Sequence, residues 1–244
     1  MTPATHPSSG TTAGPFDVAA AYRAVRERVA KAARDVGRSG GDVTVVGAAK
    51  AQAPKKLATA LQCGLAHIGE NYWQDAQTHF EADPERHATW HFIGPIQSNK
   101  TADIAAHFDW VQSLDRLKIA RRLNAQRPDA LAPLQVLIQV NISGEATKSG
   151  ILPEEISDFA RAVSEFPRLQ LRGLMAVPAP DDEGAHARLA EHFARLRDTA
   201  PGIDALSMGM TNDLETAIHA GATMVRIGTA LFGPRPTPAQ SEHP

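Results

Sequence analysis

The stretch MVRIGTA, residues 224–230, is the last of eight short apolar runs that alternate with amphipathic helical segments. Near-continuous apolar runs of this kind are typical of parallel strands that are buried on both faces. The runs are 43–49 (VTVVGAA), 67–70 (HIGE), 90–94 (WHFIG), 110–114 (WVQSL), 135–142 (QVLIQVNI), 171–177 (LRGLMAV), 205–209 (ALSMG) and 224–230. Eight strand–helix units in about 190 residues predict a single (β/α)8 TIM barrel of the α/β class.

The segments around the last run favour a closed barrel over a doubly wound open sheet. No long helical pattern follows residue 230, whereas an apolar-striped helix capped by Asp17 and ended by Gly37 precedes the first run. Because the first and last strands are neighbours in a closed barrel, this extra N-terminal helix can occupy the position after the last strand. Further helices are expected from Pro54 to Gly64, after Leu114, from Pro153, around Leu189, Phe193 and Leu196, and from Asn212, which with Glu215 resembles a capping box.

Composition indicates an ordinary globular protein. The 244 residues carry a net charge of -2, with 43% hydrophobic and 21% charged residues. This balance disfavours a dedicated nucleic-acid binder, and no apolar run approaches the roughly 18 residues that span a bilayer. The N-terminus lacks the features of a signal peptide, so we expect a cytoplasmic protein. We expect residues 1–15 and 235–244 to be disordered and 16–234 to form the barrel domain.

Several common kinds of site are disfavoured by the sequence. The ten histidines show no metal-binding spacing, and there is no Gly-rich nucleotide-binding motif. We therefore expect no metal. The single cysteine, Cys63, is expected to be a small buried hydrophobe in its helix and not a nucleophile. Lys100 and Lys148 lie in loops, where solvent exposure is the favoured interpretation, with anion contacts as the alternative.

Lys50 follows the first strand and is the first candidate site residue. By alternation Thr44, Val46, Ala48 and Lys50 share one face. If that face is the barrel interior, the Lys50 amine points into the mouth at the carboxyl ends of the strands, where barrels of this kind carry their function. The alternative is a solvent-exposed lysine at a strand end.

The last two strands supply the second part of the candidate site. In the eighth strand Val225 and Ile227 suit the helix-facing side, which turns Arg226 inward, where a buried charge needs an anion or a strong acceptor. Gly228 and Thr229 follow it, and 207–210 (SMGM) follows the seventh strand. Loops after strands seven and eight form the usual phosphate site of such barrels. Simple turns are the alternative for each motif alone.

Adjacent first and eighth strands would bring Lys50 close to this phosphate site and to Arg226. A lysine beside a phosphate site suits a Schiff base with a phosphorylated aldehyde, and pyridoxal 5′-phosphate (PLP) is the evident candidate. An arginine facing the pyridine nitrogen would keep that nitrogen unprotonated, because like charges disfavour a second proton. The ring would then be a weaker electron sink. For the loop lysines Lys100 and Lys148, binding of a second PLP molecule is a further alternative to solvent exposure.

The chain also resembles a known family, the YggS/PROSC proteins of PLP homeostasis. The stretches that carry the resemblance are VVGAAK (45–50), HIGENYWQDA (67–76), WHFIGPIQSNK (90–100), LIQVNISGEATKSG (137–150), LRGLMAVPAP (171–180), LSMGMTNDLETAI (206–218) and MVRIGTALFG (224–233). The resemblance implies a barrel similar to the N-terminal domain of alanine racemase. One departure is Ala49, where the family often has serine; by alternation it faces away from the pocket.

The resemblance also implies roles for individual residues. Lys50 would form the internal aldimine with PLP. The other implied cofactor-binding residues are Asn71 and His91 beside the cofactor, Ser207, Gly228 and Thr229 at the phosphate, Met208, Gly209 and Met210 through their backbone, and Arg226 near the pyridine nitrogen. The implied function is to hold, buffer and deliver PLP without turnover, with no catalytic residues. The implied partners are PLP and, transiently, apo forms of PLP-dependent enzymes. Composition predicts no nucleic-acid or membrane partner, and we expect a monomer.

Two other functions are left open by the residues. The first is a PLP-dependent amino-acid racemase that works with the barrel alone. Alanine racemases use a second domain that supplies a tyrosine, and we expect no room for that domain in this chain. Tyr72 lies near the mouth and is the one residue that could support catalysis; packing against the second helix is its alternative role. The second is an aldolase-like barrel enzyme that uses Lys50 without PLP.

Overall fold

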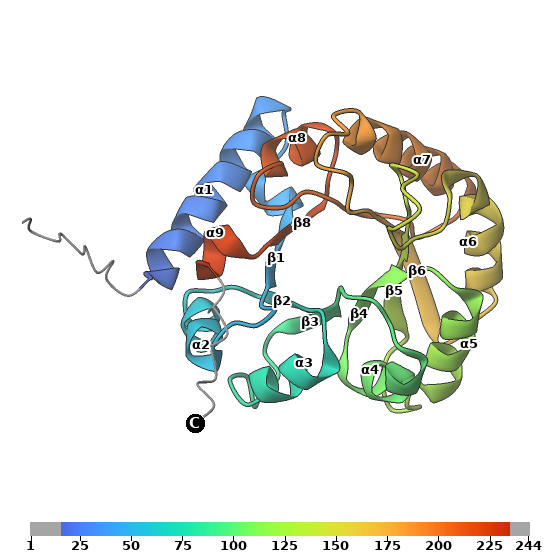
Figure 1. Cartoon of the computed structure of the whole chain (residues 1–244), viewed down its shortest axis with the longest axis horizontal. Helices are drawn as coiled ribbons and strands as arrows, with labels where there is room; N and C mark the ends of the chain where they lie inside the picture. Colours follow the sequence, from blue (N-terminus) through green and yellow to red (C-terminus); the bar gives the residue numbers. More distant parts are fainter. Residues whose placement is uncertain (1–15, 235–244) are drawn as a thin grey trace, which may run out of the picture.

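The computed structural model describes residues 16–234, which form one closed barrel of parallel strands surrounded by helices (Figure 1). The strands follow chain order, and β8 pairs with β1 to close the sheet. They are β1 (Thr44–Ala48), β2 (His67–Glu70), β3 (Thr89–Phe92), β4 (Trp110–Leu114), β5 (Leu134–Gln139), β6 (Leu169–Met175), β7 (Ala205–Ser207) and β8 (Met224–Ile227). The predicted (β/α)8 fold is confirmed. The expected disorder at 1–15 and 235–244 lies outside the described residues.

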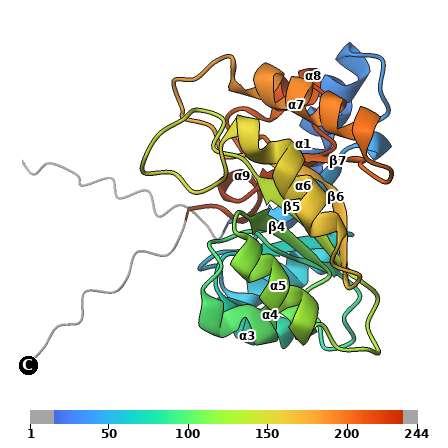
Figure 2. The ribbon, with the colours of Figure 1, turned by 90° about the vertical axis from the view of Figure 1, so that its right-hand side faces the viewer.

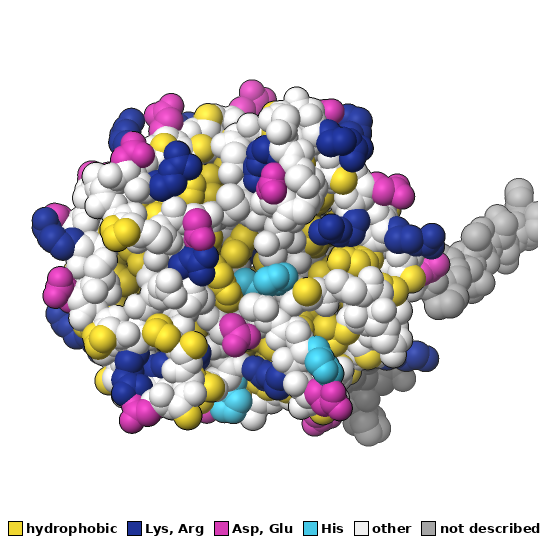
Figure 3. All heavy atoms as spheres, turned by 180° about the vertical axis from the view of Figure 1, so that it is seen from behind, with side chains coloured by type: hydrophobic (Ala, Val, Ile, Leu, Met, Phe, Trp, Pro, Cys, Tyr) yellow, Lys and Arg dark blue, Asp and Glu magenta, His cyan; other side chains and the backbone are white. Residues whose placement is uncertain are grey.

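The helices form an outer ring, as the side view in Figure 2 also shows. They are α1 (Val18–Asp35), α2 (Pro54–Gln62), α3 (Trp73–Phe80), α4 (Thr101–His107), α5 (Leu117–Gln126), α6 (Ile156–Ser164), α7 (Ala185–Thr199), α8 (Leu214–His219) and α9 (Thr229–Phe232). None of the helices in this part of the chain is both long and apolar enough to cross a membrane. Seen from behind, acidic and basic side chains are interspersed over the surface and form no extended field of one sign (Figure 3).

The leading helix completes the ring where the last strand is followed by only one helical turn. α9 is four residues long, and α1 packs against α2, α8 and α9. As the sequence predicts, the Asp17 side chain caps α1 by accepting a hydrogen bond from the Ala20 N–H at 3.0 Å. The predicted place of the extra helix, between the last and first units, is therefore confirmed.

Two local predictions were wrong. The Asn212–Glu215 capping box does not form, because α8 begins at Leu214 and its N-cap, Asp213, makes no side-chain cap hydrogen bond. Glu215 instead accepts two hydrogen bonds from Arg28 of α1, at 2.7 and 2.8 Å, so an ion pair between helices replaces the local cap. Cys63 is exposed at the end of α2, where the helix leaves the core.

Hydrophobic side chains form two separate clusters. The larger lies between the strands and the helices and includes Trp90, Leu57 and Phe232. The smaller consists of Trp110, Leu137, Met175, Ala205 and Met224. Polar side chains that are also fully buried, among them His91, Gln112 and Ser207, lie beside the smaller cluster. The barrel therefore contains a cluster of buried polar side chains whose hydrogen bonds must be formed within the protein.

A glycine allows β6 and β7 to approach closely. The β5–β6 register shifts between Val136 and Leu137, which pairs with Gly173. Gly173 has φ +151°, and a Cβ built there would collide with the carbonyl oxygen of Ala205 on β7. Only glycine fits this point of the barrel wall.

We predict that Gly173→Ala lowers the free energy of unfolding by about 4 kcal/mol or more, because the methyl group must displace β7 backbone. Gly202→Ala is the matched control: Gly202 has φ +81° but nothing within 4 Å of its Cβ position. It should cost only about 1–2 kcal/mol of backbone strain. Urea denaturation measures both values. Equal losses for the two variants would contradict the close approach at Gly173.

Candidate functional site

A cavity of about 420 Å3 opens at the carboxyl ends of the strands. This is the end at which barrels of this type carry their sites. The lining residues come from segments far apart in the sequence: Ala48, Lys50 and Gln52 at β1, Asn71 after β2, Ile93 after β3, Val177 after β6, Met210, Thr211, Asn212 and Asp213 after β7, and Arg226, Gly228 and Thr229 at β8. The predicted meeting of the β1, β7 and β8 ends in one site is observed.

Lys50 reaches the cavity from the turn that follows β1. Its ammonium nitrogen lies 5.0 Å from the centroid of the Tyr72 ring, within cation–π distance. Tyr72 is 43% exposed, so a large part of its side chain faces solvent. Lys50 therefore has a defined position at the mouth, with one aromatic face against its charge.

Arg226 is the buried cation of the site. Its side chain is almost fully buried, and its two terminal nitrogens donate to the Ser207 Oγ at 2.7 Å and to the Ala176 carbonyl oxygen at 2.8 Å. No carboxylate in the described part of the chain forms an ion pair with it. Burial lowers its pKa to about 10, while the charge of Asp213 acts in the opposite direction. The guanidinium therefore stays charged at neutral pH and faces a cavity that can hold an anion or an electron-rich atom.

A chain of hydrogen bonds runs from Arg226 across the barrel, and its direction follows from chemistry. Because arginine can only donate, Ser207 accepts from Arg226 and must give its own proton to Gln112 Oε1, at 2.6 Å. The Gln112 amide nitrogen then donates to His91 Nδ1 at 3.0 Å. His91 in turn donates through Nε2 to His67 Nδ1, again at 3.0 Å.

This direction assigns the protonation of both histidines. His91 accepts at Nδ1 and donates at Nε2, so it is neutral with its proton on Nε2. His67 accepts at Nδ1, so it is also neutral. Burial lowers the pKa of His91 well below 6.5, the nearby His67 adding to the effect, and burial also lowers the pKa of His67. Geometry and electrostatics therefore agree that Arg226 carries the only charge of this chain of residues.

The residues predicted from the sequence divide into two groups. Six of them line the cavity: Lys50, Asn71, Met210, Arg226, Gly228 and Thr229. The other four are buried and do not line it: His91, Ser207, Met208 and Gly209. The Ser207 hydroxyl is fully engaged between Arg226 and Gln112.

Sequence reasoning missed two residues that the structure makes important. Gln112 is a polar residue in the otherwise apolar stretch WVQSL, and this contrast could have indicated a buried partner. Gln52 lies in a turn, where no contrast with apolar neighbours distinguishes it in the sequence. Lys100 does not line the cavity, and the Lys148 amine contacts the Val177 carbonyl oxygen at 3.3 Å and Glu145 at 3.5 Å.

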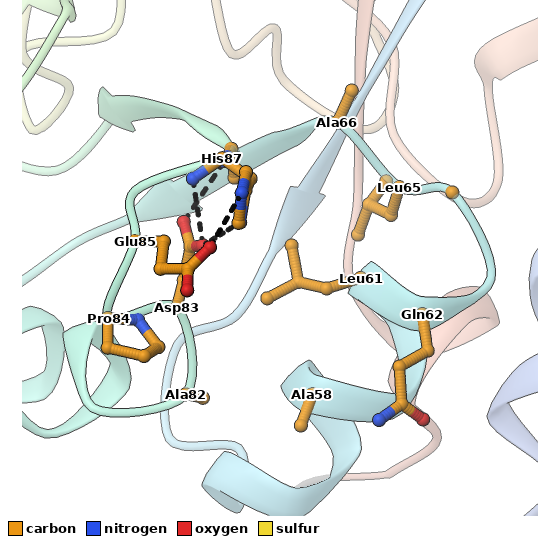
Figure 4. Close-up of a pocket in the computed structure, with 12 residues that line it drawn as sticks. Ala58, Leu61, Gln62, Leu65, Ala66, Ala82, Asp83, Pro84, Glu85 and His87 are labelled. Atoms are coloured by element: carbon orange, nitrogen blue, oxygen red, sulfur yellow. Dashed lines mark hydrogen bonds and ion pairs between the residues drawn. The ribbon is translucent and has the colours of Figure 1, made fainter.

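A second cavity, of about 480 Å3, lies elsewhere on the barrel (Figure 4). It is formed by α2 and by the segments that precede β2 and β3, at the amino ends of the strands. Its walls are mainly apolar, and its buried carboxylate, Asp83, accepts hydrogen bonds from the His87 and Ala88 N–H groups and from the Trp90 indole. Asp83 therefore stabilises a loop and is not available to a ligand.

The fold and the first cavity define a class of protein: a single α/β barrel with a lysine at the end of its first strand and an inward arginine on its last. Residues 21–236 match the family described as alanine racemase, N-terminal domain. Curated relatives include the pyridoxal phosphate homeostasis protein of Escherichia coli K12, 48% identical over 90% of this chain and 97% of the relative. The protein of the same name from Pseudomonas aeruginosa is 51% identical over 86% of this chain and 93% of the relative.

A solved structure supports the same relationship. PipY of Synechococcus elongatus PCC7942, determined with PLP bound, has a TM-score of 0.76 and 27% identity, covering 89% of this chain and 100% of PipY. The chain described here belongs to the family of pyridoxal phosphate homeostasis proteins, whose barrel is that of the alanine racemase N-terminal domain.

We predict that Ser207→Ala destabilises the ligand-free protein by about 1–3 kcal/mol, because it removes the acceptor of Arg226 and the donor to Gln112 inside the barrel. Thr229→Ala, a change of the cavity lining, is the comparison and should leave the ligand-free stability nearly unchanged. Thermal and urea unfolding without ligand measure both. A Ser207→Ala protein as stable as the wild type would mean that the hydroxyl has no such structural role.

We also predict a pH dependence from His67. Because its folded-state pKa lies below 6.5, the unfolded chain binds a proton that the folded protein does not, so stability is full above about pH 6.5 and is lost as pH falls through the lowered pKa. His67→Gln keeps an acceptor for His91 and removes this titration. Its unfolding free energy should fall less steeply below pH 6.5, by up to about 1.4 kcal/mol per pH unit. Identical slopes would contradict a lowered folded-state pKa for His67, because the group would then bind protons equally in the folded and unfolded states.

Proposed function

We propose that this protein binds PLP in the cavity at the carboxyl ends of the strands and holds it through Lys50. The single observation that carries the proposal is that Lys50 and Arg226 line the same cavity of about 420 Å3. Arg226 is buried there and forms no ion pair with a carboxylate of the described residues. Membership of the PLP homeostasis family and the PLP-bound PipY structure support the same ligand.

The cavity fits an anionic aldehyde on chemical grounds. Lys50 and Arg226 contribute two positive charges, and Thr229 and Asn212 add uncharged polar side chains. The one carboxylate of the lining, Asp213, is already engaged: its Oδ1 accepts from the Met210 N–H at 2.7 Å, and its Oδ2 lies 3.2 Å from His186 Nε2. The neighbouring His186 imidazole lowers the pKa of Asp213. When bound, PLP would supply an aldehyde carbon for an amine and an electron-withdrawing ring.

We assign roles to the lining residues as follows. The Lys50 amine reaches the aldehyde, and the Arg226 guanidinium, fixed by its contacts to Ser207 and Ala176, faces the ring nitrogen. Gly228, Thr229 and Met210, from the loops after β7 and β8, lie at the phosphate, and Asn71 lies beside the ring. Ser207, Met208, Gly209 and His91 act from behind the lining, by holding Arg226 and the loop after β7 in place.

Holding PLP, and not turning over a substrate, is the use that this arrangement favours. A charged Arg226 beside the ring nitrogen disfavours its protonation, which weakens the ring as an electron sink. The relatives are likewise named for homeostasis. Racemisation is the second candidate, and the observation in its favour is the Tyr72 ring 5.0 Å from the Lys50 amine.

Delivery of PLP to apo-enzymes is the further part of this proposal. Tyr72, Val177 and Met210 are exposed hydrophobic residues, and two of them, Val177 and Met210, line the cavity itself. An apolar rim beside the opening provides a surface that a recipient protein can cover during transfer.

We predict that the protein loaded with PLP absorbs visible light and, after borohydride reduction, gains the mass of one PLP group on the peptide that contains Lys50. Lys50→Ala should lose both signals, and Lys55→Ala, a change of a lysine outside the cavity lining, should retain them. A colourless wild type that cannot be loaded would contradict the proposal. Sustained conversion of L- to D-alanine by loaded protein would favour the racemase instead, and a reduced adduct with the mass of a sugar would favour an aldolase-like enzyme.

A further inference from the structure

A buried carboxylate–imidazole pair lies directly behind the turn that carries Lys50. Glu70, the last residue of β2, is fully buried, and its Oε1 lies 2.6 Å from Nδ1 of His79 on α3, which is 2% exposed. The other oxygen, Glu70 Oε2, is buried and has no hydrogen-bond partner. No role in the cavity itself accounts for this pair, because neither residue lines it.

The opposite side of the imidazole contacts the Lys50 turn. His79 Nε2 lies 2.8 Å from the carbonyl oxygen of Gln52, two residues after Lys50. Between them Ala51 has φ +56°, a left-handed conformation that a residue with a Cβ adopts only when its surroundings enforce it. The Gln52 N–H closes the turn on the Ala49 carbonyl oxygen at 2.9 Å. The hydrogen bond from His79 is thus a contact that holds a strained turn in place.

The proton count of the pair is fixed by its partners. The Gln52 carbonyl can only accept, so His79 Nε2 carries a proton. The 2.6 Å contact at Nδ1 needs a second proton between His79 and Glu70, either as imidazolium with carboxylate or as neutral imidazole with carboxylic acid. In both forms the pair is neutral overall, which a buried site favours.

We propose that Glu70 and His79 are positioning residues that hold the Lys50 turn toward the cavity through this shared proton. The turn loosens when the proton is lost, because the one proton left on the imidazole cannot serve both the Glu70 carboxylate and the Gln52 carbonyl. The part that concerns the cofactor rests on the proposed function. Neither residue touches PLP in this proposal; both act through Gln52 and Ala51 on the direction of Lys50.

Electrostatics indicate the direction of this pH dependence. Burial raises the pKa of Glu70; for His79 burial alone would lower the pKa, but the hydrogen bond and charge of Glu70 outweigh it and the pKa is raised. The other charged group acting on both residues is Asp75 of α3, which also raises both values. From α2, Lys56 reaches the same turn at Gln52 Oε1, 3.2 Å away, and is anchored on the Phe232 carbonyl oxygen.

The sign of the effect follows from these directions. Because the folded-state pKa is raised above 6.5 for His79 and above 4.5 for Glu70, the pair keeps its proton at pH values at which the same groups in the unfolded chain have lost it. The contact is lost as the pH rises through the raised value. The opposite dependence, with loss on acidification, applies to His67, so the two histidines can be distinguished by titration.

The direct test uses the PLP-free protein and measures the amide-exchange protection factor of Gln52 as a function of pH. Wild type should lose protection as the pH rises through the raised pKa of the pair. His79→Leu should lower protection at least tenfold at pH 7, because the carbonyl of Gln52 loses its donor. His87→Leu, a change of an exposed histidine, is the control and should not alter Gln52.

Conservative variants separate positioning from simple packing. Glu70→Gln can donate to His79 Nδ1 without a titratable proton, so it should keep the protection of Gln52 and make it independent of pH. His79→Gln retains a donor near the Nε2 position and should recover part of the protection lost in His79→Leu. Unchanged protection in His79→Leu, or an unchanged pH profile in Glu70→Gln, would overturn the proposal.

A second readout connects the pair to the cofactor. In PLP-loaded protein the rate of PLP release should increase more steeply with pH for wild type than for Glu70→Gln, which shares the intrinsic pH dependence of release but lacks the titratable pair. If the protein cannot be loaded with PLP, the proposed function fails while the exchange measurement still decides whether the pair holds the turn. Equal pH dependences of release in wild type and Glu70→Gln would overturn the link between the pair and Lys50.

Discussion

The charge of Arg226 is the constraint on which the interior of this barrel depends. A guanidinium that is almost fully buried and has no carboxylate must have its donors satisfied by neutral acceptors, and here they are the Ser207 hydroxyl and the Ala176 carbonyl. Since arginine only donates, this first contact sets the direction of every hydrogen bond that follows, through Gln112 to the two histidines. The barrel interior therefore contains one line of hydrogen-bonded polar side chains, with apolar side chains packed beside it.

The same constraint accounts for the cavity. If Arg226 were paired with an acid inside the protein, the cavity would carry little net positive charge and would have no reason to bind an anion. Instead the positive charges of Lys50 and Arg226 line one cavity, while the acid of the lining, Asp213, is held by Met210 and His186. Lys50 depends on a different support, the strained turn at Ala51 and its contact with His79. The two cations are thus positioned by independent sets of buried polar residues.

Much of the fold could be predicted from the sequence, because apolar strands that are buried on both faces leave an unmistakable pattern. The helix capped by Asp17 lies where the sequence predicts it, and the strand containing Arg226 begins at Met224 as predicted but ends at Ile227, before the end of the apolar run at 230. Side-chain alternation and the adjacency of the first and last strands are enough to predict that Lys50, Arg226 and Thr229 line one cavity, as they do. The pattern could not show which inward-facing residues line the cavity. Alternation gives the face of the strand on which a residue lies, but not whether its side chain reaches the cavity or is buried behind the lining. Ser207 and His91 are examples of the second case.

The remaining errors share a different cause, which is tertiary contact that overrides a local signal. Glu215 has the spacing of a capping box but pairs with Arg28, a residue 187 positions away in the chain. Cys63 follows an apolar helical pattern but lies at the helix end, where the chain turns to the surface. The Glu70–His79 pair left no motif, because its partner Gln52 is contacted through the backbone and not the side chain.

A crystal structure of the protein soaked with PLP is the measurement that tests the central claim most directly. The account predicts electron density that is continuous from the Lys50 amine to the aldehyde carbon, with the ring nitrogen facing the Arg226 guanidinium and the phosphate beside Gly228 and Thr229. PLP bound to Lys100 or Lys148 with the cavity empty, or an Arg226 that leaves Ser207 to bind the phosphate, would contradict it.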